Sequence, residues 1–480
     1  MTPTAKKTGT GLVPLLVIAT AQLMLVLDDS IVNIALPSIQ SQLGVDPVHL
    51  PWIVNGYILA FGALLLLGGR IGDLWGRKRT LRVGLVVFVL GSLAGGLGQS
   101  AEMLIAARAL QGIGAALTAP NVLALIATTF QERKTRDTAL SLYGAMSGIG
   151  IVVGLLLGGL LTELLGWRWV FIINVPIGLL VLLGTRTLVA PERHTGRLGF
   201  LDGVLGTAGT VSLVYAITRF GEDSFADPVA YALVAAAAVL LVVFVLLQRR
   251  SRNPLVPLAL FADRNRSGAY LTMLGLAIGP MGILYVVTLY LQQVQHYQPL
   301  PTGLAMLPFA AGIVLGAGSA PKLLLKAAPR WITAAGGLLS TLGALWIAWS
   351  ISQHGGWLHI APGFLVVALG FGFGVMALTQ AAVYRVDPDK AGIASALLNS
   401  SQQIGVALGL ALLAGVAATV TAGAGGTAAG DGLVAGYGAA LVVGAGVLAA
   451  STVLALATLS GQAQASEAAV TVAPGRPDRN

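Results

Sequence analysis

Long apolar runs separated by short polar breaks follow one another along almost the whole chain. A helix needs about 20 apolar residues to cross a bilayer, and the runs reach that length about fourteen times. We predict membrane-spanning helices over residues 12–36, 50–68, 81–98, 102–126, 138–161, 168–189, 201–219, 228–248, 268–291, 302–320, 331–350, 360–381, 392–420 and 433–458. Strands of a membrane barrel would instead alternate apolar and polar residues over about ten positions. The pattern therefore predicts an all-α polytopic membrane protein.

The composition agrees with a chain that lies mostly in lipid. Hydrophobic residues make up 56% and charged residues 10% of the 480 positions, whereas a soluble protein carries roughly 25% charged residues. If the N-terminus is cytoplasmic, every Lys and Arg except Arg108, Arg168 and Arg219 falls in a cytoplasmic loop, a tail or a flanking span end. This is the asymmetry of the positive-inside rule. The net charge of +9 therefore indicates topology, with both termini cytoplasmic, and not nucleic-acid binding.

Signatures of catalysis and of metal binding are missing. The chain has no cysteine and no HExxH, GxSxG or P-loop motif, and its five histidines lack ligand spacing. The sequence therefore predicts that the protein is not an enzyme and holds neither a metal nor an organic cofactor.

A weak internal repeat indicates how the spans are grouped. The segment from Gly68 to Arg82 after the second span and the segment from Gly316 to Arg330 after the tenth share glycines followed by basic residues. Transporters built from repeated halves show such similarity. We therefore expect a six-helix half over residues 1–199, an inserted helix pair over 200–250, a second six-helix half over 251–460 and a disordered cytoplasmic tail over 461–480.

Asp28 and Asp29 lie inside the first predicted span. An ionised carboxylate at that depth costs about 2.5–3.5 kcal/mol on insertion scales, so acids within the membrane are candidates for function. Neighbouring helical side chains project about 100° apart, and two close carboxylates resist joint ionisation. One of the two could therefore hold a proton near neutral pH and release it on the other side, and the sequence leaves open which one.

Arg108 is the only basic residue deep within a predicted span. At about 1.5 Å per residue, its depth agrees with that of Asp28 within roughly 5 Å. We expect Arg108 to pair with Asp28 or Asp29, and we expect protonation or substrate binding to weaken the pair. The alternative is a static buried salt bridge that only fixes the helices.

The second half offers no such acid. From residue 267 to residue 460 the acids are Asp387, Asp389 and Asp431, all in predicted loops, so a proton site is expected in the first half. Aromatic and amide side chains suit a mostly apolar pocket with a few orienting polar contacts, although each could instead anchor or pack a helix. The candidate substrate-binding residues are Asn33, Asn55, Tyr57, Gln111, Tyr285, Tyr290, Phe309, Gln380, Asn399, Gln402 and Gln403.

Glycine-rich and charged segments are candidates for conformational change. Residues 69–79 join the second and third spans, where Arg77 could pair with an acid such as Asp137. Glycines at four-residue spacing on the fifth span form a flat face for close helix contact, either as a sliding seam or as plain packing. The candidate gating residues are Gly69, Asp73, Gly76, Arg77, Lys78, Asp137, Gly150, Gly154, Gly158 and Gly159.

Together these segments resemble the major facilitator superfamily, and specifically its fourteen-span drug/proton antiporter branch. The stretch from Leu27 to Pro37 is similar to the branch's span-1 motif, with serine at position 30 where threonine is usual. Residues 69–79 are similar to the superfamily's signature loop. One departure is Gly154-Leu155, where the branch has a Gly-Pro pair. Further similarity lies in Leu104, Arg108, Gln111, Gly112 and Gly114, in Trp167 to Pro176 and in Gly392 to Gly409.

The resemblance implies a major facilitator fold and a proton-coupled exporter of amphipathic or cationic small molecules that works by alternating access. Asp28 or Asp29, with Arg108, would couple the proton, and the proton gradient would take the place of a cofactor. We expect a monomeric, multi-pass protein of the bacterial inner membrane that confers multidrug or antibiotic resistance. Two alternatives remain open: a proton symporter of the same fold that imports a solute, and a membrane receptor that transports nothing.

Overall fold

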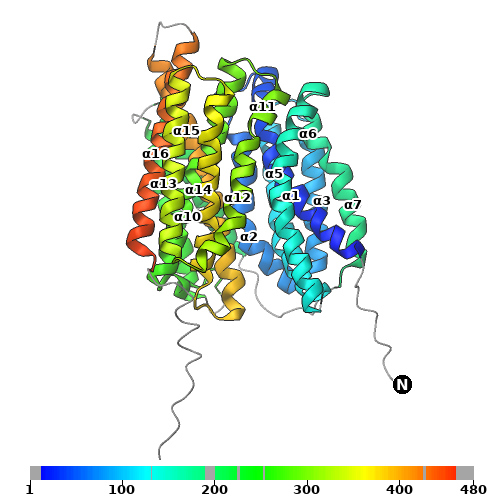
Figure 1. Ribbon diagram of the computed structural model, residues 1–480. Coiled ribbons are helices and arrows are strands. Elements are labelled where there is room, and N and C mark those ends of the chain that lie inside the picture. The colour runs from blue at the N-terminus through cyan, green and yellow to red at the C-terminus, as the bar shows by residue number, and fades with distance from the viewer. Residues whose placement is uncertain are drawn as a thin grey trace, which may run out of the picture.

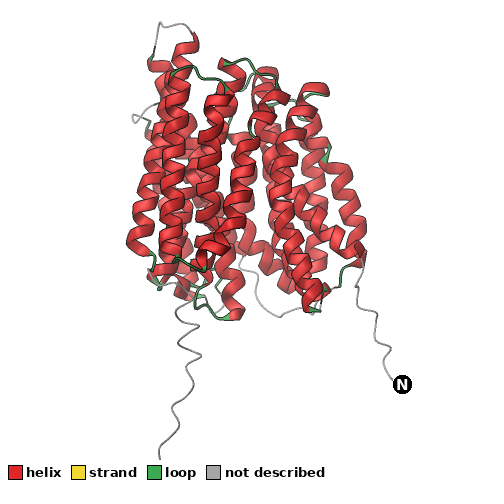
Figure 2. Ribbon diagram, in the orientation of Figure 1, coloured by secondary structure: helices red, strands yellow, loops and turns green. Residues whose placement is uncertain are grey.

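Each predicted span is a helix in the computed structural model. The structure describes residues 12–130, 132–189, 200–223, 227–251, 254–424 and 429–460. Within these ranges fourteen helical segments are long and apolar enough to cross a membrane. They stand side by side in one bundle, with no strand among the described residues (Figure 1, Figure 2). The all-helical class and the number of spans are thereby confirmed.

The helices follow one another in the predicted order. The first eight spans are α1 (Leu12–Leu43), α2 (Trp52–Trp75), α3 (Arg77–Gly96), α4 (Ala101–Thr129), α5 (Arg133–Leu164), α6 (Arg168–Ile172) continued by α7 (Asn174–Gly184), α8 (Phe200–Asp223) and α9 (Pro228–Arg250). The other six are α10 (Arg264–Leu289), which ends in a π turn (Tyr290–Val294), α11 (Pro299–Ala305) continued by α12 (Leu307–Leu324), α13 (Pro329–Ser352), α14 (Trp357–Val383), α15 (Pro388–Gly423) and α16 (Ala429–Thr458). The start of α1 and the end of α16 lie at the same end of the bundle, at the bottom of Figure 1. We call this the terminal end and the opposite one the distal end.

The helices extend beyond their apolar runs. Residues 69–79, predicted to form a loop, are helical except at Gly76, because α2 ends at Trp75 and α3 begins one residue later. Gly76 has a φ of 102°, a conformation that glycine adopts without steric cost, and its N–H donates to the Gly72 oxygen at 3.0 Å. Helical bonds thus pair backbone groups that would be costly to leave unpaired near lipid.

Glycines bring the helices of each half close together. In the first half, a Cβ on Gly158 of α5 would lie 2.7 Å from the Ile31 oxygen of α1. In the second half, a Cβ on Gly343 of α13 would lie 2.7 Å from the Gly363 oxygen of α14. Cβ atoms do not approach other atoms so closely, so these glycines are what lets the backbones touch.

α8 and α9, the predicted inserted pair, pack against each other, and α8 lies beside α2 and α15. Trp52 of α2 meets Tyr215 of α8 edge-on, with ring centroids 5.6 Å apart. α9 leaves many apolar side chains exposed, among them Val239 at 61% and Val242 at 57%. The inner helix α8 therefore contacts both halves, and the outer helix α9 presents an apolar surface suited to lipid.

Candidate functional site

Asp28 is enclosed by polar side chains from α4 and α7. Its side chain has no exposed surface, and its Oδ2 accepts a hydrogen bond from Arg108 Nη1 at 2.6 Å. Its Oδ1 accepts from Gln111 Nε2 at 2.9 Å and from Asn174 Nδ2 at 2.7 Å. A buried carboxylate needs such partners to offset its lost hydration. Of the two adjacent acids, Asp28 is the one that pairs with Arg108.

Arg108 connects the same network to α2 and α3. Its Nε donates to the Ile53 oxygen at 3.1 Å, and its guanidinium carbon lies 4.3 Å from the centroid of the Tyr57 ring, within range of a cation–π interaction. Gln111 accepts from Arg108 Nη1 at 3.0 Å and donates to Ser92 Oγ at 2.8 Å. Nη2 of Arg108 is buried and has no hydrogen-bond partner among the residues that the structure describes. Five helices, α1 to α4 and α7, therefore meet at one buried ion pair.

The sequence of α4 explains why the network forms here. Arg108 and Gln111 are three residues apart and therefore lie on one face of the helix. A Cβ on Gly112 would collide with the backbone oxygen of Tyr57. A Cβ on Gly91 of α3 would lie 2.8 Å from the backbone nitrogen of Gln111. Because both positions are glycine, α4 comes close enough to α2 and α3 for its polar side chains to reach their partners.

The carboxylate of Asp29 has different surroundings. Asp29 is one of two residues between 24 and 36 of α1 that are not buried. Its backbone oxygen accepts from Asn33 at 3.1 Å, but its side chain forms no hydrogen bond or ion pair within the described part of the chain. Asp29, Asn33 and Gln40 share one helix face by their spacing, and Gln40 accepts a hydrogen bond from Gln293 of α10. Asp29 is therefore the acid on the face of α1 that is turned toward the second half.

Amide side chains join the two halves near the distal end, a contact that the apolar pattern does not predict. Gln293 Nε2 donates to Gln40 Oε1 at 2.8 Å, and Gln293 Oε1 accepts from the Tyr437 hydroxyl at 2.6 Å. Gln292 Nε2 donates to the Ile34 oxygen at 3.0 Å. Gln292 and Gln293 lie in the π turn after α10, and such turns are frequent at functional sites. Two adjacent glutamines at the end of an apolar run were the available signal.

The glycines of α5 face α1 on one side and the second half on another. A Cβ on Gly154 would collide with the Ser30 hydroxyl, and a Cβ on Gly159 would lie 2.8 Å from the Cα of Leu300 in α11. The Leu300 N–H donates to Glu163 Oε2 at 2.9 Å. α5 is one continuous helix at the place where the resembled branch has its Gly-Pro pair. Its glycine positions let α5 pack closely against α1 on one side and against α11 of the second half on another.

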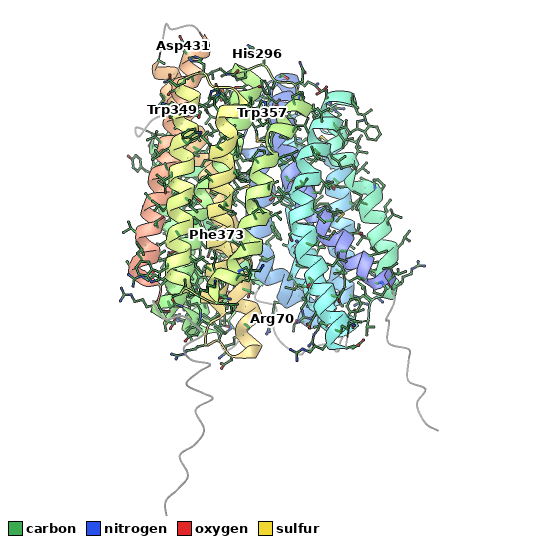
Figure 3. All side chains as sticks on the ribbon, viewed as in Figure 1. Arg70, His296, Trp349, Trp357, Phe373 and Asp431 are labelled. Atoms are coloured by element: carbon green, nitrogen blue, oxygen red, sulfur yellow. The ribbon has the colours of Figure 1, made fainter. Side chains whose placement is uncertain are left out.

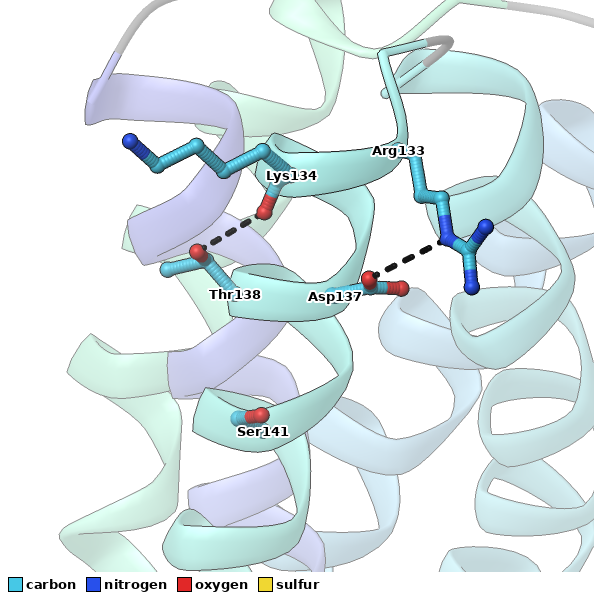
Figure 4. Close-up of a pocket in the computed structure, with 5 residues that line it drawn as sticks. All are labelled: Arg133, Lys134, Asp137, Thr138 and Ser141. Atoms are coloured by element: carbon cyan, nitrogen blue, oxygen red, sulfur yellow. Dashed lines mark hydrogen bonds and ion pairs between the residues drawn. The ribbon is translucent and has the colours of Figure 1, made fainter.

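Charged residues at the start of α3 and of α5 pair locally. Arg77 Nη2 lies 2.7 Å from Asp73 Oδ1. Asp137 lies instead beside Arg133, with 3.9 Å between its Oδ2 and the arginine Nε, on an exposed turn of α5 (Figure 4). The contact considered between Arg77 and Asp137 is not formed, because each has a partner four residues away in the sequence.

Lys78 links the start of α3 to the end of the sixth span. Its Nζ donates to the backbone oxygens of Arg186 at 3.1 Å and Leu188 at 2.7 Å. A Cβ on Gly69 would lie 3.7 Å from Pro120 of α4, so α2 and α4 also touch at this level. These contacts hold the terminal end of the first half together.

Several residues predicted to bind substrate are enclosed. Asn55 donates to the Ala407 oxygen of α15 at 3.3 Å, and Tyr290 donates to the Gly355 oxygen at 3.0 Å. Phe309 packs edge-on against another phenylalanine, with ring centroids 5.5 Å apart. The buried candidates are Asn33, Asn55, Tyr57, Gln111, Tyr285, Tyr290 and Phe309. In this conformation these side chains hold helices together and do not line an open surface.

The remaining candidates lie on α14 and α15. Gln380, Gln402 and Gln403 are half-buried, and Asn399 is exposed. Next to Asn399, the Ser400 hydroxyl donates to the Gly62 oxygen of α2 at 2.8 Å. This part of α15 therefore faces the first half, as the Asp29 face of α1 faces the second.

A comparison with protein families decides what kind of protein has this geometry. The family model described as Major Facilitator Superfamily matches residues 18–410. The chain belongs to the Major Facilitator Superfamily. It is therefore a transporter and not an enzyme, and the predicted family and fold are confirmed.

Relatives within the superfamily are named for antibiotics. The chain is 43% identical over 415 residues to the puromycin resistance protein pur8 of Streptomyces alboniger. The aligned region covers 85% of this chain and 82% of that protein. It is 36% identical over 426 residues to the cephamycin export protein CmcT of Amycolatopsis lactamdurans, with 87% of each chain covered. It is 34% identical over 402 residues to the lincomycin resistance protein of Streptomyces lincolnensis, with 83% of each chain covered.

Solved structures share the fold at low sequence identity. A POT family transporter in complex with a thioalcohol-conjugated peptide matches with a TM-score of 0.67 at 14% identity, over 92% of this chain and 95% of that one. The human organic anion transporter MFSD10 matches with a TM-score of 0.59 at 15% identity, over 92% of this chain and 99% of that one. At this identity the match concerns the fold alone.

Proposed function

We propose that this Major Facilitator transporter exports small molecules from the bacterial cytoplasm in exchange for protons. The three relatives described above, named for resistance to an antibiotic or for its export, support the direction of transport. The cargo is an amphipathic or cationic drug or natural product. The proton gradient across the inner membrane supplies the energy, and no cofactor takes part.

The observation that carries the proposal is that Asp29, a half-buried residue whose side chain has no hydrogen bond or ion pair among the described residues, lies beside the enclosed Asp28. Asp28 already accepts three hydrogen bonds, so the carboxylate free to take up a proton or a cationic group is that of Asp29. An ionised Asp29 attracts a cation, and a protonated Asp29 does not. Proton and cargo therefore compete for one group, which is the requirement for exchange.

The buried ion pair next to Asp29 links this exchange to movement of the helices. Arg108 keeps one buried nitrogen, Nη2, that finds no partner in the described part of the chain. A change of charge at Asp29 alters the electrostatic potential at this guanidinium, and in the low dielectric of the membrane interior the effect is large. The network connects five helices, α1, α2, α3, α4 and α7. The change therefore acts on most of the first half at once.

The terminal end faces the cytoplasm in this proposal. Figure 3 shows Arg70 at that end and His296 and Asp431 at the distal end, in agreement with the excess of basic residues that cytoplasmic loops carry. The halves are hydrogen-bonded near the distal end through Gln293 and Gln40. Contact between the halves at this end is what the proposal requires of the step in which cargo enters from the cytoplasm.

Transport by inverted membrane vesicles tests the proposal, with ethidium and puromycin as cationic probes. An imposed proton gradient, acidic inside, should drive both probes into vesicles that contain the wild-type protein. Asp29→Asn should lower this uptake at least tenfold at equal expression. The matched control is Asp387→Asn, which changes an exposed acid with no role in the proposed transport site and should keep wild-type uptake.

Three outcomes would contradict the proposal. Uptake of neither probe by the wild-type protein would contradict the export of cationic compounds. Probe movement in the same direction as the protons would show symport. Gradient-driven uptake by Asp29→Asn at the wild-type rate would show that another group carries the proton.

A further inference from the structure

A cavity of about 790 Å³ lies at the terminal end of the second half, away from the proposed transport site. It is formed by the starts of α10 and α13 and the end of α16, whose lower ends stand together in Figure 1. The residues that line it are Asp263, Arg264, Asn265, Arg330, Leu456, Ala457, Thr458, Leu459 and Ser460. Nothing in the transport mechanism uses this cavity.

The polar groups of the cavity favour an anion. Arg264 and Arg330 both line it, and Arg264 Nη2 donates to the Ala457 oxygen at 2.8 Å. Nε of Arg330 is buried and has no hydrogen-bond partner among the described residues, an arrangement that costs free energy unless a ligand accepts the bond. The one acid, Asp263, caps α10 by accepting from the Arg266 N–H at 2.8 Å. Two arginines therefore line one concave site, and one of them, Arg330, keeps a buried N–H without a partner among the described residues, which suits a phosphate.

The surroundings place the cavity at the level of lipid headgroups. Trp331, next to Arg330, is 57% exposed, and exposed tryptophans mark the membrane–water interface. From Trp331 toward the middle of the bundle, Leu338, Leu342 and Leu345 of α13 are exposed as well. Counted from Trp331, the successive spacings are seven, four and three residues, so the tryptophan and the three leucines lie on one helix face. A molecule with a charged head in the cavity would thus find an apolar stripe for its chains.

We propose that this cavity binds the phosphate group of an anionic phospholipid, with an acyl chain along the α13 stripe. The phosphate bridges Arg264 and Arg330, and it supplies the acceptor that Arg330 Nε lacks. Basic pockets between spans on the cytoplasmic side suit such headgroups. The site lies between α10, α13 and α16, so an occupied site holds the terminal ends of these three helices together.

The test uses the full-length protein in detergent with three probes: dioleoyl phosphatidylglycerol, dioleoyl phosphatidylcholine and glycerol phosphate. Native mass spectrometry counts retained lipid, and the midpoint of thermal unfolding reports stabilisation. Phosphatidylglycerol should be retained and should raise the midpoint, and phosphatidylcholine should do so at least tenfold more weakly. The double variant Arg264→Gln/Arg330→Gln should lose this preference, whereas Arg264→Lys/Arg330→Lys should keep part of it because the charges remain.

The matched control is Arg249→Gln/Arg250→Gln, which removes two exposed arginines at the end of α9 and should bind lipid as the wild type does. The proposal is overturned if the control loses as much of the preference for phosphatidylglycerol as Arg264→Gln/Arg330→Gln does. It is also overturned if Arg264→Gln/Arg330→Gln keeps the full preference. Equal binding of both lipids would overturn the anionic headgroup. Equal stabilisation by glycerol phosphate would show a site for soluble phosphates instead. Unliganded unfolding midpoints that agree among the variants establish that all are folded.

Discussion

Asp28 and Asp29 are consecutive residues of α1, but only the carboxylate of Asp28 is held by other side chains. Arg108 Nη1 lies 2.6 Å from Asp28 Oδ2 with both side chains fully buried, whereas Asp29 keeps part of its surface exposed. The difference follows from the helix, because successive side chains point about 100° apart. One acid therefore meets other helices of its own half, and the other lies on the face of α1 that carries Gln40, which bonds to Gln293. Substitution of Asp28 should therefore lower stability, whereas substitution of Asp29 should lower transport.

Asp28→Asn should destabilise the protein by about 3–5 kcal/mol, because it leaves the buried Arg108 without its counter-charge. Equilibrium unfolding in mixed micelles measures this change. Asp137→Asn removes the acid of an exposed pair and should stay within about 0.5 kcal/mol of the wild type. The double variant Asp28→Asn/Arg108→Gln should recover part of the loss, since no uncompensated charge remains. Equal stability of Asp28→Asn and Asp137→Asn would show that the buried pair is not held as described.

Tyr57 should support the Arg108 guanidinium through its ring and not through its hydroxyl. The ring centroid lies 4.3 Å from the guanidinium carbon. Tyr57→Phe keeps the ring and should keep wild-type stability, whereas Tyr57→Leu should lose about 1–2 kcal/mol more than Tyr57→Phe, in the range of a desolvated cation–π interaction. The same unfolding measurement applies, and similar losses for both variants would argue against a role of the ring.

Two glycines of α5 should respond oppositely to the same substitution. Gly158→Ala places a Cβ 2.7 Å from the Ile31 oxygen, so α5 must move away from α1, at about 1–3 kcal/mol. Gly144 has nothing within 4 Å of a Cβ, and Gly144→Ala should stabilise the helix by about 0.5–1 kcal/mol. Thermal unfolding and transport rate measure both variants. A loss at Gly144→Ala as large as that at Gly158→Ala would refute the close seam.

Gln293→Ala should favour opening at the distal end, because it removes the bond to Gln40 that joins the two halves. The chain contains no cysteine, so Asn33→Cys, which stands at a buried position on the Asp29 face of α1, can report access. A membrane-impermeant maleimide added to the distal side should label this cysteine several times faster in the Gln293→Ala background. Gln353→Ala is the control, since Gln353 is exposed and, of the described residues, its side chain bonds to neighbouring Ser352 alone. Unchanged labelling in Gln293→Ala would mean that the amide contact does not hold the halves closed.

The sequence alone predicted the helices and the chemistry at the right depth. Apolar runs of sufficient length can form only helices in lipid, so the fourteen spans follow from local pattern. The pairing of Arg108 with one of the two acids followed from the rise of a helix, which turns residue number into depth. The length of α2 and α3 on either side of Gly76 was not predicted, since backbone pairing extends the helices beyond their apolar residues.

Only the tertiary structure decided which side chains meet at a given depth. That depends on how each helix is rotated and which neighbour it faces, and neither is a property of one segment. For this reason the choice of Asp28 over Asp29, the Tyr57 ring beneath Arg108 and the Gln293 contact with Gln40 appear only in the packed bundle. The number, length and composition of the spans belong to the sequence, because lipid acts on each segment separately. The division of roles between two adjacent aspartates belongs to the fold, because it is set by the helices that pack on either side of them.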